Sequence, residues 1–186
     1  SAEKLAYRKF WKRDEGGYYK DGTPREHNII TEYDSRYSES WNKFLNHVWS
    51  KEFIKKLADV TGVEVTNLRH FCFMYAKKDC FQSNHIHNVS DKTLIVFLYF
   101  SKNWEEDDPG GTYLSDGIDE SKILFEPNDL DNTALFVLDG PAAAHGMRKI
   151  TKDVERRAIQ LTYEPFSTTD GWYGRTNKEV FEPIDL

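Results

Sequence analysis

The stretch Asn84-His85-Ile86-His87-Asn88 places two imidazoles two residues apart, shortly before the apolar run Thr93 to Phe100. In an extended strand, residues i and i+2 point to the same face of a sheet, so His85 and His87 are expected to converge on one point. A third imidazole, His145, follows another strand-like run. Imidazole nitrogens bind Zn, Cu, Fe and Ni. The pattern therefore indicates a metal site formed by three histidines, if the chain brings them together.

Length and composition limit the possible functions. A chain of 186 residues is expected to form one domain with a substantial core. Its net charge of −6 argues against a nucleic-acid partner, because phosphate contacts need a basic surface. No apolar stretch approaches the roughly 18 residues of a membrane-spanning helix, so no membrane partner is expected. The two cysteines, Cys72 and Cys80, do not form a secreted disulfide framework, which predicts a cytoplasmic protein.

Two helices are predicted before the histidines. Apolar side chains recur at helical spacing over 41–48, and a second apolar stripe follows over 53–60. Ser50 is suited to cap the N-terminus of the second helix, and Gly62 to end it.

The rest of the chain is strand-like. Runs of β-branched and aromatic residues, separated by Gly, Pro and Asp turns, predict many short strands and hence a sandwich or barrel. The predicted strands are 70–75, 93–100, 112–114, 123–125, 133–138, 147–150 and 158–163.

The segment from Phe53 to Arg157 resembles the Fe(II)/2-oxoglutarate-dependent oxygenases, in their prolyl-hydroxylase-like branch. Several landmarks of that superfamily occur here in the same order, each weak alone and specific together. They are the helix end Leu57 to Gly62, a strand containing Tyr75, His85-Ile86-His87-Asn88, the strand end Leu98 to Trp104, Gly110-Gly111, Leu135 to Gly140, His145-Gly146-Met147 and Arg156-Arg157-Ala158-Ile159.

The resemblance implies a mainly β fold with N-terminal helices and a double-stranded β-helix (jelly-roll, cupin-like) core. The resemblance does not cover 1–35 or the tail, but together with the chain length it predicts a single oxygenase-like domain over 1–186. Within it we expect an N-terminal arm (1–35), supporting helices (36–62), the jelly-roll core (68–165) and a C-terminal tail (166–186).

The resemblance also implies functional roles. Fe(II) would be bound by His85 and His145, and the co-substrates would be 2-oxoglutarate and O2. Arg156 would bind the distal carboxylate of 2-oxoglutarate, a task that suits a planar guanidinium. Tyr75 and Tyr99 match positions whose hydroxyls help to hold 2-oxoglutarate in this branch. Because Arg157 alternates to the other face of its strand, only one of the two arginines can point inward, and the spacing favours Arg156.

The pattern departs from the superfamily at His87, which stands where that superfamily has a metal-binding Asp. Four arrangements follow. His87 could be a third ligand in an active 2-oxoglutarate oxygenase, which we favour, or a ligand in a three-His dioxygenase that does not use 2-oxoglutarate. It could also swing away from the metal, as in the halogenase relatives. Finally, the domain could bind a metal or ligand without catalysis.

Under the favoured interpretation the protein hydroxylates an unactivated C–H bond of a small molecule or a peptide. The sequence leaves the substrate and the oligomeric state open. The acidic run Glu105-Glu106-Asp107-Asp108 is consistent with a solvated loop or with a preference for a cationic substrate.

Overall fold

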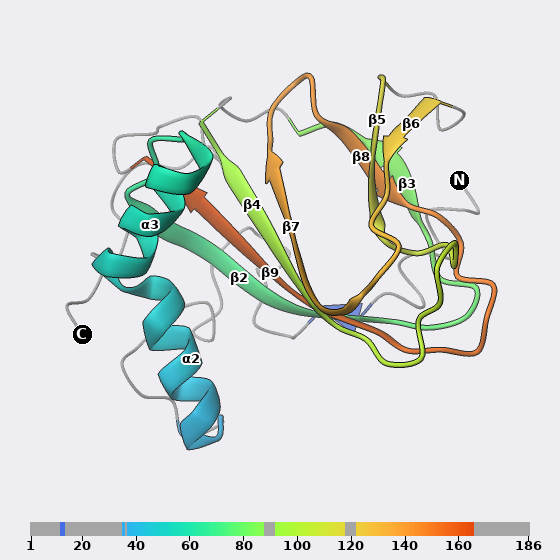
Figure 1. Cartoon of the computed structure of the whole chain (residues 1–186), viewed down its shortest axis with the longest axis horizontal. Coiled ribbons are helices and arrows are strands. Elements are labelled where there is room, and N and C mark those ends of the chain that lie inside the picture. The colour runs from blue at the N-terminus through green and yellow to red at the C-terminus, as the bar shows by residue number, and fades with distance from the viewer. Residues whose placement is uncertain (1–11, 14–34, 36, 88–91, 118–121, 166–186) are drawn as a thin grey trace, which may run out of the picture.

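The computed structural model describes residues 12–13, 35, 37–87, 92–117 and 122–165, which form two helices packed against two facing β-sheets (Figure 1). The predicted N-terminal arm and C-terminal tail lie almost entirely outside the described residues. Among the described residues, no helix is both long enough and apolar enough to span a membrane.

The two helices are those predicted by the apolar periodicity, α2 (Glu39–Trp49) and α3 (Lys51–Thr61). Ser50 separates them, and its hydroxyl accepts a hydrogen bond of 3.2 Å from the backbone N–H of Phe53. Gly62 ends α3 at a φ of 71°, a left-handed conformation that glycine adopts without a Cβ clash. Both predicted caps are confirmed.

The described strands make two antiparallel sheets. The larger has the order β1-β2-β9-β4-β7 and the smaller the order β3-β8-β5-β6. From β2 onward the chain crosses to the other sheet at every connection except β5–β6, which is the jelly-roll path. The predicted fold class is confirmed. The strands are β1 (Lys12–Arg13), β2 (Asn67–Ala76), β3 (Gln82–His85), β4 (Leu94–Phe100), β5 (Thr112–Ser115), β6 (Ile123–Phe125), β7 (Asp131–Leu138), β8 (Ala144–Met147) and β9 (Arg156–Glu164).

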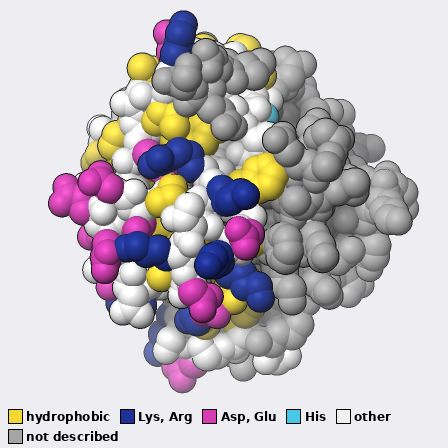
Figure 2. All heavy atoms as spheres, turned by 90° about the vertical axis from the view of Figure 1, so that its right-hand side faces the viewer, with side chains coloured by type: hydrophobic (Ala, Val, Ile, Leu, Met, Phe, Trp, Pro, Cys, Tyr) yellow, Lys and Arg dark blue, Asp and Glu magenta, His cyan; other side chains and the backbone are white. Residues whose placement is uncertain are grey.

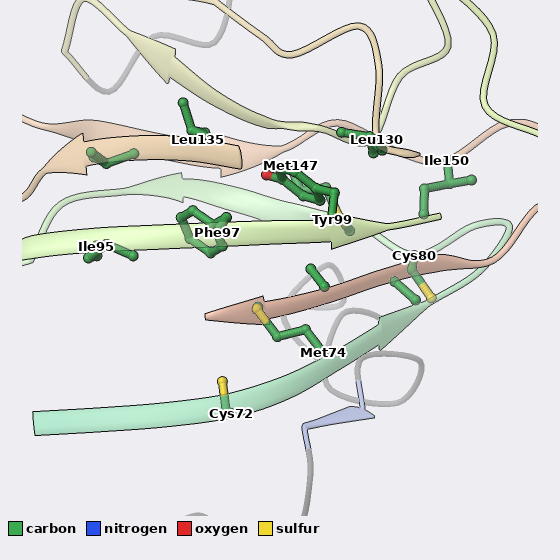
Figure 3. Close-up of a cluster of buried hydrophobic side chains, with 13 residues drawn as sticks. Cys72, Met74, Cys80, Ile95, Phe97, Tyr99, Leu130, Leu135, Met147 and Ile150 are labelled. Carbon is green, nitrogen blue, oxygen red and sulfur yellow. The ribbon is translucent and has the colours of Figure 1, made fainter. Parts of the chain in front are cut away.

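Two apolar layers hold these elements together. The inner layer lies between the sheets, where Figure 3 shows side chains of the larger sheet and Met147 of β8 in one buried cluster. The outer layer packs α2 and α3 onto the opposite face of the larger sheet. Each fully buried aliphatic or aromatic side chain in these layers contributes roughly 1.5–3 kcal/mol. Strands β2, β9 and β4 of the larger sheet are thus buried on both faces, whereas the edge strand β7 exposes Phe136 and Leu138, and the smaller sheet contributes one face to the inner layer.

The strand predicted over 147–150 is wrong in position, because β8 runs from Ala144 to Met147. Met147 and Ile150 are both buried in the inner layer, whereas Arg148 and Lys149 between them are exposed and outside the ladder. Two buried apolar residues at either end of a loop therefore produced a strand-like pattern. The shift matters, because it places His145 within β8.

Candidate metal and co-substrate site

Three histidine side chains meet at the end of β3. His85 is the last residue of β3 and pairs with His145 of β8, while His87 lies two residues beyond the strand. The ring centroids are 4.5 Å apart for His85 and His145, and 4.7–4.8 Å apart for the two pairs that include His87. One nitrogen from each ring lies within 4.8 Å of the others. The three histidines singled out from the sequence are therefore brought together from distant parts of the chain.

The Nδ1 atoms of the three rings share one kind of hydrogen bond, and His85 Nε2 also lies 3.4 Å from the side-chain amide nitrogen of Gln82. Each Nδ1 contacts an oxygen acceptor: Ser83 O at 2.8 Å from His85, Ala143 O at 2.7 Å from His145, and Asp139 Oδ2 at 2.8 Å from His87. An Nδ1 that donates to oxygen carries the proton of the neutral ring, so each Nε2 keeps a lone pair. This is the tautomer that a metal ligand requires.

The surroundings of two of the rings also favour the neutral form. Burial, reinforced by the neighbouring imidazole of His145, lowers the pKa of His85 to about 4. Burial likewise lowers the pKa of His145 from its ordinary value. Both rings are consequently neutral near pH 7 and available as ligands.

Asp139 is a site residue that the sequence did not single out. It follows β7 directly, its side chain is fully buried, and its backbone N–H donates to Thr93 O at 2.8 Å. In the sequence, Asp139-Gly140-Pro141 indicates a turn, and this turn signal concealed an inward-facing carboxylate.

A second polar group lies between the sheets, around Arg156 at the start of β9. The Arg156 side chain is fully buried, as the alternation predicts, whereas Arg157 is exposed. Arg156 Nε donates to Gly110 O at 2.7 Å, and an NH2 group donates to Thr112 Oγ1 at 3.0 Å. Tyr99 joins this group, with its hydroxyl 2.9 Å from Thr112 Oγ1 and its ring 5.1 Å from the guanidinium carbon. Thr112 was not anticipated from the sequence.

Gly110, whose carbonyl accepts from Arg156, lies where the backbone passes close to two side chains. A Cβ on Gly110 would lie 2.8 Å from Ile150 and 2.9 Å from Trp104, and its φ of 131° disfavours any other residue. Glycine therefore lets the backbone approach closely, so that the Gly110 carbonyl can reach Arg156.

Tyr75 is not brought to this group. Its hydroxyl donates to Glu155 at 2.7 Å, and its neighbours on β2, Met74 and Ala76, are the residues that enter the inner layer. Because side chains alternate along a strand, Tyr75 faces away from the space between the sheets. The geometry therefore gives no support to the predicted co-substrate role of Tyr75.

The acidic run 105–108 is partly neutralised within the fold. Lys152 bridges Glu105 and Asp108, and Asp108 Oδ1 lies 2.8 Å from the ammonium group. Figure 2 shows Lys and Arg side chains interleaved with Asp and Glu over the described part of one face. The run is thus better described as a paired surface loop than as a patch for cationic ligands.

No protein-family model and no curated protein sequence matches the chain. Solved structures do match. A prolyl-4-hydroxylase from Pseudomonas putida aligns with a TM-score of 0.54 and 12% identity, covering 72% of this chain and 69% of that one. A prolyl hydroxylase from Trichoplax adhaerens, in complex with a hypoxia inducible factor oxygen degradation domain peptide fragment, aligns with a TM-score of 0.54 and 16% identity, covering 88% and 79%.

An oxidoreductase of the 2OG-Fe(II) oxygenase family from Burkholderia pseudomallei aligns with a TM-score of 0.50 and 13% identity, covering 93% of this chain and 79% of that one. At these identities the likeness concerns the fold. The chain has the fold of the Fe(II)/2-oxoglutarate oxygenases, so the resemblance inferred from its sequence is confirmed at that level.

Proposed function

We propose that this protein is an Fe(II)- and 2-oxoglutarate-dependent oxygenase that hydroxylates an unactivated C–H bond through a three-histidine metal site. One observation carries the proposal. His85, His87 and His145 each commit Nδ1–H to an oxygen acceptor, which leaves Nε2 as the nitrogen with a free lone pair, and the three rings bring one nitrogen each to within 4.8 Å of the others. The chemistry of this donor set fits Fe(II), since imidazole is a competent ligand for iron.

Arg156 is the residue to anchor 2-oxoglutarate. A guanidinium binds a carboxylate through two parallel N–H groups, and the hydrogen bonds to Gly110 O and Thr112 Oγ1 fix the plane of the guanidinium. Tyr99 and Thr112 present hydroxyl groups beside it. Arg156 is fully buried beside the apolar inner layer, and a polar contact with a bound dianion is stronger in such a low-dielectric setting than at the surface.

The bound metal and 2-oxoglutarate would supply the oxidising chemistry, in which 2-oxoglutarate loses CO2 to give succinate while one oxygen atom of O2 enters succinate and the other enters the substrate C–H bond. The protein side chains hold the three imidazoles in one tautomer and orient the co-substrate. Three neutral ligands leave Fe(II) with its full double charge, which the 2-oxoglutarate dianion would neutralise.

The substrate class is a peptide or a small molecule. The Trichoplax adhaerens prolyl hydroxylase of the same fold holds a peptide fragment, which supports a peptide as one candidate. His87 keeps 22% of its side chain exposed, so the site is open to solvent on the His87 side. A substrate would approach from there.

Anaerobic titration tests the proposal. Fe(II) is added to the metal-free protein, followed by 2-oxoglutarate, and the visible spectrum is recorded. A charge-transfer band that requires both additions supports chelation of 2-oxoglutarate at the metal. Failure of 2-oxoglutarate to bind the iron-loaded protein overturns the proposal, and metal binding without it favours a three-His dioxygenase or a non-catalytic binding domain.

Two variants test whether the charge-transfer band comes from the three-histidine site. His145→Ala should abolish the band, whereas His47→Gln, which changes an exposed histidine of α2, should leave it intact. Succinate release from 2-oxoglutarate in air, lost in His145→Ala and retained in His47→Gln, would extend the result from binding to turnover.

A further inference from the structure

The three histidines differ in what accepts their Nδ1–H. His85 and His145 donate to backbone carbonyls two residues earlier in the chain, within their own loops or strands. His87 donates to a side-chain carboxylate, Asp139, which comes from the end of β7. The ring orientations of His85 and His145 are thus set by hydrogen bonds to nearby residues in the chain, whereas the ring orientation of His87 is set by a residue from a distant part of the chain.

His87 benefits from such a partner, because β3 ends at His85 and neither Ile86 nor His87 belongs to a strand. Asp139 is well placed to supply it. The Asp139 side chain has no solvent exposure, and its backbone N–H donates a hydrogen bond to the carbonyl of Thr93, the residue before the neighbouring strand β4. A short, buried carboxylate on a fixed backbone loses little freedom when it binds a ring.

A carboxylate also differs electronically from a carbonyl. A hydrogen bond to an anionic acceptor is about twice as strong as one to a neutral acceptor. A carboxylate behind a ligating imidazole makes its other nitrogen a stronger donor to the metal. It also places negative charge near a site whose ligands are otherwise neutral. Within the described structure the Asp139 carboxylate has one hydrogen-bond partner, His87, because its Oδ1 is buried without a partner.

We propose that Asp139 is a positioning residue for the metal site, acting through His87 to fix its ligating tautomer and to supply the negative charge that no metal ligand provides. The inference rests on the metal site of the proposed function, but not on 2-oxoglutarate or on turnover. The carboxylate in this site acts through an imidazole instead of touching the metal.

The test is the affinity of the protein for Ni(II) and Co(II), measured by calorimetric titration without 2-oxoglutarate. Asp139→Asn should weaken both metals about 10- to 100-fold, the usual cost of losing a partner behind a metal-bound imidazole. It should also shift the visible absorption bands of bound Co(II). Asp108→Asn, which neutralises another buried carboxylate, should leave both readouts unchanged.

Testing Asp139→Asn in a protein that already carries His87→Asp separates a positioning role of Asp139 from a merely structural one. In His87→Asp there is no imidazole to orient, and two carboxylates face each other. Like charges at such short range disfavour ionisation of both, so adding Asp139→Asn there should keep or improve metal affinity. An equal fall in affinity in both backgrounds, no fall in the native background, or no metal binding by the native protein would each overturn the inference.

The outcomes also distinguish this inference from the proposed function. If Asp139→Asn weakens Ni(II) and Co(II) as expected but 2-oxoglutarate does not bind, the oxygenase proposal fails and the role of Asp139 stands. If 2-oxoglutarate chelates the metal while Asp139→Asn has no effect on metal affinity, the oxygenase proposal stands and the role of Asp139 is rejected. Thermal unfolding of each variant in chelator shows whether a fall in affinity comes from loss of the fold.

Discussion

Arg156 and Arg157 are chemically identical neighbours in opposite environments. Arg156 is fully buried beside Thr112 and Tyr99, and Arg157 is exposed and paired with Glu155. Consecutive side chains of a β-strand point to opposite faces of the sheet, so adjacent residues can have opposite environments. The pair therefore offers a matched comparison at adjacent positions.

Arg156→Lys should raise the dissociation constant for 2-oxoglutarate at least about 10-fold, because an ammonium group cannot reproduce two parallel N–H donors. Arg157→Lys should change it less than about twofold. Both constants can be measured by titrating 2-oxoglutarate into the Ni(II)-loaded protein, with Ni(II) affinity as the check that the metal site is intact. Equal effects of the two variants would contradict the assignment of Arg156.

At the residue scale, the sequence predicted what depends on local spacing. His85, His87 and His145 were identified by their strand contexts, alternation predicted that one of Arg156 and Arg157 points inward, and the spacing of the resembled motif favoured Arg156. Asp139 and Thr112 were missed, because each acts through a partner far away in the sequence. An Asp before Gly-Pro and a Thr after Gly-Gly look like ordinary turn and strand residues until the pairing of strands is known.

At the scale of one element, β8 is constrained more tightly than its four residues suggest. Gly146 follows His145, and a Cβ there would lie 2.4 Å from the Tyr113 hydroxyl and 2.8 Å from the Gln82 carbonyl oxygen. The first contact is with β5 and the second is with β3. Gly146 therefore sets how closely β8 can lie to both neighbours.

Gly146→Ala should destabilise the protein by roughly 1–3 kcal/mol, as overpacking of a buried position does, and should weaken Ni(II) binding because β8 carries His145. Gly62→Ala adds the same methyl group where nothing lies within 4 Å, at a φ of 71°. It should cost roughly 1–2 kcal/mol through backbone strain and leave Ni(II) affinity unchanged. Urea unfolding and calorimetric titration measure the two effects, and unchanged Ni(II) affinity in Gly146→Ala would contradict the expectation.

Elements with a strong internal pattern were the most predictable. The helical stripe and the capping residues Ser50 and Gly62 fixed α3, because those signals lie within the helix itself. β8 was displaced, since its borders are set by pairing with β3 and β5 and not by its own apolar residues. β3 is polar and half-buried, so it has no apolar strand pattern of its own. The histidine motif drew attention to this segment instead.

At the scale of the whole molecule, the helices and the larger sheet are joined by a buried polar contact. The Tyr163 hydroxyl of β9 donates to Val48 O of α2 at 2.7 Å. Burial raises the pKa of Tyr163 well above its ordinary value. The folded protein therefore retains this proton at pH values where the unfolded chain, whose tyrosines titrate near pH 10, has released it.

Stability should fall as the pH rises above about 10, because the unfolded state then binds fewer protons than the folded state. Tyr163→Phe removes this contribution. The difference in unfolding free energy between the native protein and Tyr163→Phe should shrink by about 1 kcal/mol between pH 10 and pH 11. Urea unfolding at both pH values measures it, and a difference that stays constant would show that Tyr163 titrates alike in both states.

The pairing of β3 with β8 has a consequence for how the smaller sheet forms. Only two registered pairs join these strands, Gln82 with Met147 and His85 with His145, and an irregularity separates them. His85 lies on β3 and His145 lies opposite it on β8, so an ion bound between the two imidazoles would cross-link the two strands. This sparsely bonded junction between β3 and β8 would then be closed by coordination in addition to backbone hydrogen bonds, and loading of the metal would coincide with completion of the sheet.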